Sequence, residues 1–369
     1  MDHAGTQASQ KTVGWWNSYL APVLAFVGAA TLGLSMFQSP PALYAVVTGL
    51  EGFLLMIAVF ATLRHGEIVA HWLGEPYGTI VLTMAVTVIE VSIIASLMLD
   101  DSANPELARQ TLFSAAMLVC NGLVGTCLVY GAVYHREQEI SMTGSSAYLT
   151  VLMALSVLTL LMPNYTGDPG ASFTQPQLTF VAVVALALYG AFLFMQTVRH
   201  PGYFRDALHH DVQVARPKMR IGLWHLLWLL ISVASVVTVS ERFAHGLEDG
   251  LRIIRTPDAI LGVVIALLVL LPEAMTALQA ARANALQKSM NIALGSALAT
   301  IGLTIPSVAM ISLYTGKELI LGLGQRDSML LILTLAISVV SFGTGRTNVL
   351  TGFVHLVIFF IYLFFQIFP

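Results

Sequence analysis

The chain has 369 residues, of which 57% are hydrophobic and only 10% are charged, and its mean hydropathy is +0.80. Soluble domains carry about 25% charged residues, so this composition excludes a soluble globular protein and indicates an integral membrane protein in a lipid bilayer. The formal net charge of −3 is spread over many short loops, and it predicts no nucleic-acid partner.

Apolar stretches of near-spanning length predict an all-α membrane fold with eleven transmembrane helices. After a polar N-terminal segment, 1–17, the expected spans are 18–37, 42–63, 76–99, 111–134, 147–163, 178–198, 221–240, 258–280, 290–314, 328–343 and 347–368. Loops on the side of the N-terminus carry more Lys and Arg than the loops on the other side. The positive-inside rule therefore predicts a cytoplasmic N-terminus and a C-terminus outside.

The longest hydrophilic break, 200–220, divides the spans that follow the first helix into two sets of five. It contains His209, His210 and Asp211, and we expect it to be a cytoplasmic linker. An odd number of spans in each set means that the second set enters the membrane with opposite polarity. This is the arrangement of an inverted repeat, with the halves at 42–199 and 221–369.

Glu90 is the only ionisable residue between Pro76 and Leu99, close to the middle of its span. A charge at that depth costs roughly 2.5 to 3.5 kcal/mol on insertion scales, so such residues usually face a polar cavity. Thr83 and Thr87 precede it at helical spacing and place hydroxyl groups on the same helix face. This pattern indicates a binding site for a cation or a proton.

An inverted repeat predicts a second acidic residue in the equivalent helix of the later set, and Glu273 is there, directly after Pro272. Thr276 lies one turn beyond it. The span after each acidic helix is rich in small and polar residues, which allow close helix approach and helix breaks where a cation could bind. These residues are Ser114, Asn121 and Gly125 in one half, and Ser296, Thr300, Thr304 and Ser307 in the other.

Glu51 is a third carboxylate inside a span and has no evident counterpart in the other half, which leaves a place on a proton path open. His65, His71, His225 and His355 stand apart from one another in the sequence. They do not have zinc-ligand spacing, so they predict no metal site.

Several motifs resemble the calcium/cation antiporter superfamily, in its cation/proton exchanger branch, and are most similar to the bacterial ChaA-type antiporters. The resemblance covers nearly the whole chain after the first span. It is carried by RH at 64–65, LGEPYG at 73–78, VIEVS at 88–92, PE at 272–273, GSALAT at 295–300, and SFGTGRTNVL at 341–350 followed by HL at 355–356.

This resemblance implies a lone first helix, two inverted five-helix halves, and a cation held between the halves by Glu90 and Glu273 as metal ligands. It also implies the inner membrane of a bacterial cell. Many calcium/proton exchangers carry Gly-Asn three residues ahead of each Glu, where this chain has Val86-Thr87 and Val269-Leu270. The missing amides leave sodium or potassium open as the transported cation, and the oligomeric state is open as well.

The expected function is secondary active transport of Ca²⁺, or of Na⁺ and K⁺, in exchange for protons, without a cofactor. Two carboxylates can hold either protons or a cation. Thr87, Asn121, Thr276, Ser296 and Thr300, with carbonyls or water, would complete a calcium shell of six to eight oxygens. The alternatives are a strictly monovalent antiporter, a passive channel, and an intramembrane enzyme that uses the paired carboxylates; for the last, no nucleophile-base pair or H-E-x-x-H spacing is present.

Overall fold

The computed structural model describes residues 41–74, 77–99, 105–166, 171–204, 217–253, 256–257 and 259–368, together with residues 19, 22, 23, 25 and 28. Within these residues, ten helices are long and apolar enough to cross a membrane. The expected first span at 18–37 lies outside the described residues, apart from the five isolated positions. The His209-His210-Asp211 segment lies outside them altogether.

The expected spans from 76–99 onward are confirmed, except that the helix expected at 221–240 is longer than predicted. Each confirmed span is one helical segment of the described chain. The confirmed segments are α3 (Tyr77–Leu99), α4 to α5 (Leu107–His135), α6 to η5 (Met142–Tyr165), α7 to η6 (Gln175–Arg199), α9 (Ala259–Arg282), α10 to α11 (Leu286–Thr315), α12 (Gln325–Gly343) and α13 (Val349–Ile367).

Two helices are longer than the apolar stretches that predicted them. The helix expected at 42–63 is α2 (Pro41–Leu73), and the one expected at 221–240 is α8 (Met219–Ile253). A charged side chain ends an apolar run without ending a helix, and this is why the sequence underestimated both. The end of α2 comes only at Gly74, whose φ of 69° and hydrogen bond to the Ala70 carbonyl form a glycine cap.

The chain divides into two compact units, which are described in turn. The first contains Met1–Ser92 and Ala215–Gly250, and the second contains Ile93–Val214 and Leu251–Pro369. Helix α3 passes from the first unit into the second between Ser92 and Ile93.

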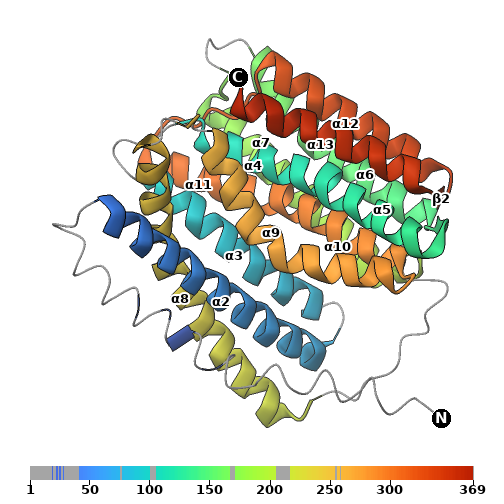
Figure 1. Ribbon diagram of the computed structural model, residues 1–369, viewed down its shortest axis with the longest axis horizontal. Coiled ribbons are helices and arrows are strands. Elements are labelled where there is room, and N and C mark those ends of the chain that lie inside the picture. The colour runs from blue at the N-terminus through green and yellow to red at the C-terminus, as the bar shows by residue number, and fades with distance from the viewer. Residues whose placement is uncertain are drawn as a thin grey trace. The chain divides into compact units, whose positions relative to one another are not determined.

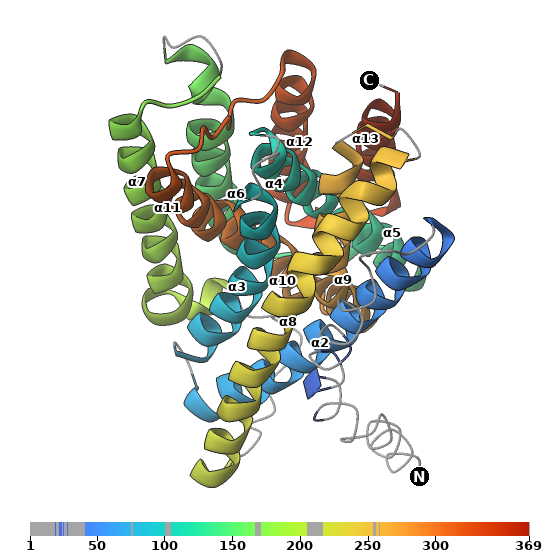
Figure 2. The same cartoon turned by 90° about the vertical axis from the view of Figure 1, so that its left-hand side faces the viewer.

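In the first unit, α2 and α8 pack against each other in antiparallel directions (Figure 2). Thr48 of α2 meets Gly246 of α8, where an added Cβ would lie 2.6 Å from the threonine Oγ1. Towards the other end of the helix pair, Gly222 of α8 lies directly against the indole of Trp72. Glycines at such contacts let membrane helices approach closely, so α2 and α8 are closely packed along most of their length.

The second unit is built around the span from α4 (Leu107–Met117) through the π-helical turn η3 (Leu118–Leu123) to α5 (Val124–His135). Nearly every residue of α4 and η3 is buried. Helix α9 packs along α4 and α10, while α13 packs along α5 (Figure 1). The remaining elements of this unit are β1 (Gln138–Glu139), α6 (Met142–Ser156), η4 (Val157–Leu161), η5 (Met162–Tyr165), α7 (Gln175–Phe194), η6 (Met195–Arg199), η7 (Pro201–Phe204), α10 (Leu286–Ala299), η8 (Thr300–Thr304), α11 (Ile305–Thr315) and β2 (Arg346–Thr347).

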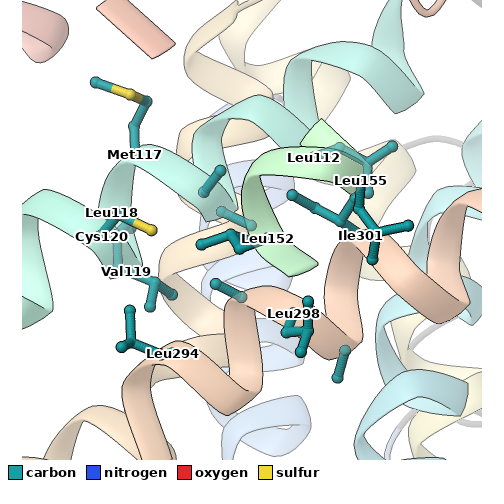
Figure 3. Packing of buried hydrophobic residues seen from close by; sticks show 14 of the residues in the cluster. Leu112, Met117, Leu118, Val119, Cys120, Leu152, Leu155, Leu294, Leu298 and Ile301 are labelled. Carbon is teal, nitrogen blue, oxygen red and sulfur yellow. The ribbon is translucent and has the colours of Figure 1, made fainter. Parts of the chain in front are cut away.

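The core of this unit includes a cluster of aliphatic side chains that three helical segments contribute (Figure 3). Leu112 and Val119 belong to the central span, Leu152 belongs to α6, and Leu298 and Ile301 belong to the α10 to η8 segment. In a bilayer the lipid tails are as apolar as these side chains. The helices are therefore held together by close packing and by buried hydrogen bonds more than by the hydrophobic effect.

The two acidic helices are each followed by a span of the same construction, in which one π-helical turn interrupts an α-helix. These turns are η3 and η8. The loops also form two antiparallel β-pairings. Strand β1 pairs with β2 through Gln138 and Thr347, and a β-bridge joins Ser172 to Ile320. The matched turns are what the predicted repeat requires, although its limits at 42–199 and 221–369 remain a prediction.

Candidate cation and proton site

Glu90 lies on the buried face of α3 in the first unit. Its side chain is only 5% exposed, as is that of Thr87, while Thr83 is half-buried. The three residues are separated by four and then three positions, so they lie along one face of the helix. Two residues after Glu90, Ser92 Oγ lies 3.3 Å from Ser240 Oγ, which links α3 to α8.

Glu273 lies on α9 in the second unit, where it is half-buried. The preceding residue, Pro272, stands inside the helix and has no N–H to donate to the carbonyl four residues earlier. The hydroxyl of Thr276 donates to the Pro272 carbonyl at 3.1 Å. One backbone hydrogen bond of α9 is therefore missing beside the carboxylate, although the helix continues through this point.

The other expected ligands of the later half lie on one helical segment. Ser296 is half-buried on α10, and Thr300 is 4% exposed at the first residue of η8. A π-helical turn changes the register of the side chains that follow it and often marks a functional site. Because Glu90 belongs to one unit and Glu273 to the other, their pairing stays a prediction.

Asn121 lies within a buried polar network of the second unit. Its Nδ2 donates to Thr334 Oγ1 at 2.8 Å, and its Oδ1 lies 3.2 Å from His355 Nδ1. The other ring nitrogen of His355 lies 3.0 Å from Ser341 Oγ. Asn121 and His355 are fully buried, so the amide is committed to neighbours on α12 and α13.

Glu51 is fully buried on α2, on the side of the helix that packs against α8. Among the described residues, no group forms a hydrogen bond with either of its carboxylate oxygens or with the nearby Thr48 Oγ1. The guanidinium of Arg242 on α8 interacts with this carboxyl electrostatically. A carboxyl in such a place is stabilised by a proton or by a nearby cation.

The expectation that the intramembrane histidines stand apart is wrong for two of them. His65 of α2 and His225 of α8 face each other in the first unit, with 2.8 Å between their Nδ1 atoms. The two residues are 160 positions apart, so no spacing rule could have paired them. No group of three or more potential metal-ligating His, Cys, Asp or Glu side chains occurs among the described residues.

Comparison with known proteins decides the family. The model of the sodium/calcium exchanger protein family matches residues 43–198 and 224–368, which include both acidic helices and both spans with π-helical turns. The chain belongs to this exchanger family. Its members are transporters, so the alternative of an intramembrane enzyme is wrong.

Two similar relatives of this exchanger are bacterial proteins of nearly the same length. The sodium-potassium/proton antiporter ChaA of Escherichia coli is 38% identical over 98% of each chain. The protein y4hA of Sinorhizobium fredii is 41% identical over 95% of this chain and 96% of its own. It is described as an ionic transporter by inference.

The fold of the exchanger also matches solved structures. Native YfkE superposes with a TM-score of 0.74 at 14% identity, covering 95% of this chain and all of its own. The H⁺/Ca²⁺ exchanger CAX superposes with a TM-score of 0.70 at 16% identity, covering 94% of this chain and 87% of its own. At these identities the likeness shows a common fold.

Proposed function

We propose that this exchanger carries a cation across the membrane in exchange for protons, and that Glu90 and Glu273 bind both in turn. The observation that carries the proposal is the matched placement of two acidic residues. Each lies in the apolar interior of the second helix of its set of five, in a chain of the exchanger family. Acidic residues at such depth are costly and are usually kept for function.

The chemistry follows from competition for the same oxygens. Two ionised carboxylates supply two negative charges and up to four oxygen ligands to a cation, whereas two protonated carboxyls supply neither charge. In a low-dielectric site, a bound cation and bound protons each offset the free-energy cost of the buried negative charge. The site therefore holds one or the other, and rarely both. Opening of the site to alternate sides of the membrane then couples the cation gradient to the proton gradient.

The residues that would complete the cation shell lie on the same two helices or directly after them. Thr87 shares the buried face of Glu90, and Thr276 lies one turn beyond Glu273. Ser296 and Thr300 belong to the segment that packs against α9. We leave Asn121 out of this shell, because Thr334 and His355 already engage its amide. Thr83 and Glu51 are the candidates for the proton path.

Calcium is the first candidate cation, because two carboxylates balance one divalent ion. CAX, which shares the fold, is an H⁺/Ca²⁺ exchanger. Sodium or potassium is the second candidate, and two observations favour it. ChaA, at 38% identity, is a sodium-potassium/proton antiporter, and Val86-Thr87 and Val269-Leu270 offer no side-chain amide ahead of either carboxylate.

The membrane in question is, in this proposal, the inner membrane of a bacterial cell, with the N-terminus in the cytoplasm and the C-terminus outside. The excess of Lys and Arg in one set of loops supports this orientation, and the bacterial origin of both relatives supports the membrane. With an inward proton force, such an antiporter exports its cation.

Dissipation of a pH gradient in inside-out vesicles tests the proposal when Ca²⁺, Na⁺ and K⁺ are added separately. We expect one or more of them to collapse the gradient in vesicles with the wild type, and none to do so with Glu90→Gln or Glu273→Gln. Glu139→Gln is the matched control, because Glu139 lies on the exposed ribbon, where it pairs with Arg346 at 3.1 Å. This control should behave as the wild type.

The outcomes are distinct. A response to Ca²⁺ alone identifies a calcium/proton antiporter, and a response to Na⁺ or K⁺ alone identifies a monovalent one. Cation uptake that needs no pH gradient and moves no protons would indicate a passive channel. Native exchange by a correctly inserted Glu273→Gln variant would exclude the role proposed for that carboxylate.

A further inference from the structure

The pair of His65 and His225 is a second group of titratable side chains, separate from the proposed exchange site. His65 is fully buried on α2 and His225 is half-buried on α8. Their ring centroids lie 5.0 Å apart, and their Nδ1 atoms face each other at 2.8 Å. A nitrogen-to-nitrogen distance of this length is a hydrogen bond, so one Nδ1 donates and the other accepts.

The proton count of this pair is limited by its geometry. A neutral imidazole has one N–H and one lone pair. In the neutral pair, the donor ring keeps a lone pair on Nε2, and the acceptor ring carries its hydrogen there. A first added proton binds to the Nε2 of the donor ring, and the bond between the two Nδ1 atoms remains and becomes charge-assisted. A second proton has only the accepting Nδ1 left, and it turns both facing atoms into donors.

The surroundings of the pair oppose that second proton. It would place two positive rings in contact, and the guanidinium of Arg64 on α2 already acts on His225 electrostatically. The other ring systems at the pair are Trp228, stacked 6.2 Å from His65, and Tyr19, whose ring centroid lies 5.3 Å from His65. From α3, the apolar side chain of Leu82 lies against Gly66, the residue that follows His65.

The pair also lies within the close contact between α2 and α8. Gly66, next to His65, has room for no larger residue without moving Leu82 of α3, and it lies close to Leu229 of α8. On the other side of the pair, Gly222 lies against the indole of Trp72. Repulsion between the two rings therefore acts on a contact between α2 and α8 that has little space to absorb it.

We propose that His65 and His225 form a proton-binding site shared by α2 and α8, which holds one proton with its hydrogen bond intact and loosens this helix pair when a second proton binds. The site goes beyond the proposed exchange function, because neither histidine belongs to the cation shell. It makes the packing of α2 against α8 depend on pH.

Nitrogen NMR of the full-length protein in lipid nanodiscs, with ¹⁵N-labelled histidine, tests the site without any transport assay. We expect a coupling across the Nδ1 to Nδ1 bond near neutral pH, which is lost on acidification. His65→Gln and His225→Gln should each remove this coupling and change the titration of the remaining partner. His71→Gln is the matched control, since His71 lies exposed at the end of the same helix. His225→Gln, on the half-buried partner, is the milder change for folding.

A double-mutant comparison of exchange against pH provides the functional readout. Each single variant should shift the acid limb of the pH profile by about one pH unit, and the double variant should shift it no further than either single one. Independent titration of the two histidines, or additive shifts in the double variant, would overturn the proposal. Glu273→Gln keeps the NMR coupling in any case, so failure of the exchange mechanism is distinguishable from failure of this site.

Discussion

The side-chain amide of Asn121 donates a 2.8 Å hydrogen bond to Thr334 Oγ1 and thereby joins the π-helical turn η3 to α12. The hydroxyl of Thr334 donates its hydrogen to the Leu330 carbonyl at 2.7 Å, so its oxygen must be the acceptor of the hydrogen bond from the Asn121 amide. The carbonyl oxygen of Asn121 is then the atom that faces His355 and accepts from its Nδ1. This leaves Nε2 of a neutral His355 to accept from Ser341.

Replacement of Asn121 by Leu, which has a similar volume, should destabilise the second unit. Two buried groups, His355 Nδ1 and Thr334 Oγ1, each lose a partner, and an unsatisfied buried polar group costs about 1–3 kcal/mol. We expect a lower midpoint of thermal unfolding for the detergent-purified protein. Thr126→Val is the control on the neighbouring α5: Thr126 is an exposed residue whose hydroxyl donates only within its own helical segment, to the Gly122 carbonyl at 2.6 Å, so the midpoint should be nearly unchanged. Equal midpoints for the wild type and Asn121→Leu would show that the network adds nothing to stability.

Tyr362 tests a second buried contact between α13 and the central span. Its phenol donates to Ser114 Oγ at 2.7 Å, and the side chain is fully buried. Tyr362→Phe should cost about 1 kcal/mol of unfolding free energy, since only one net hydrogen bond is lost. Tyr314→Phe is the control, because the Tyr314 side chain is 92% exposed. A loss as large in the control as in Tyr362→Phe would contradict this account.

Gly352 of α13 should tolerate no side chain. An added Cβ would lie 2.8 Å from the Val129 backbone nitrogen and 2.9 Å from the Gly125 carbonyl oxygen of α5, and backbone atoms cannot rotate away as a side chain does. Gly352→Ala should therefore push α13 away from α5 and lower both the yield of folded protein and its thermal midpoint. Gly190→Ala in α7, where an added Cβ meets nothing within 4 Å, should be neutral or slightly stabilising. An unaltered Gly352→Ala protein would mean that the two helices can separate at little cost.

Glu51→Gln separates a structural role of Glu51 from a role on the proton path. Glutamine keeps the size of the side chain and removes the acid, so insertion and thermal stability should be preserved. If Glu51 passes protons, the exchange rate should fall, because the variant binds none there. Glu137→Gln, at an exposed position after α5, is the control for the same chemical change. Native exchange rates at every pH in Glu51→Gln would remove Glu51 from the proton path.

The sequence predicted most of the helices, because the bilayer imposes simple rules on length and charge. An apolar stretch of spanning length forms a helix, and a lone acid such as Glu90 or Glu273 stands out against it. The same rules ended the spans of α2 and α8 too early, because charged residues on a helix that continues past the apolar core look like a loop. Helix α2 ends at Gly74 because this residue has a positive φ and caps the helix, and a hydropathy profile does not detect such a cap.

Contacts between distant helices were beyond reach from the sequence. The hydrogen bonds of Asn121 to Thr334 and His355 could not be predicted from sequence spacing, because spacing defines a helix face and not the helix that covers it. The π-helical turns η3 and η8 alter that face further, since each shifts the side chains that follow it. His65 and His225 were missed for the same reason: only the packing of α2 on α8 brings them together.

The pairing of Gln138 with Thr347 has a consequence for biosynthesis. The ribosome completes α5 and β1 long before it reaches β2 and α13, so α5 and β1 are made before the ladder partner of β1 and the packing partner of α5. Until then, the face of α5 that carries Gly125, its glycine face, lacks the α13 helix that covers it and remains open to lipid and to the insertion machinery. Final assembly of the second unit must therefore follow the synthesis of β2 and α13. A nascent chain that stops before α13 would present this exposed glycine face to membrane proteases.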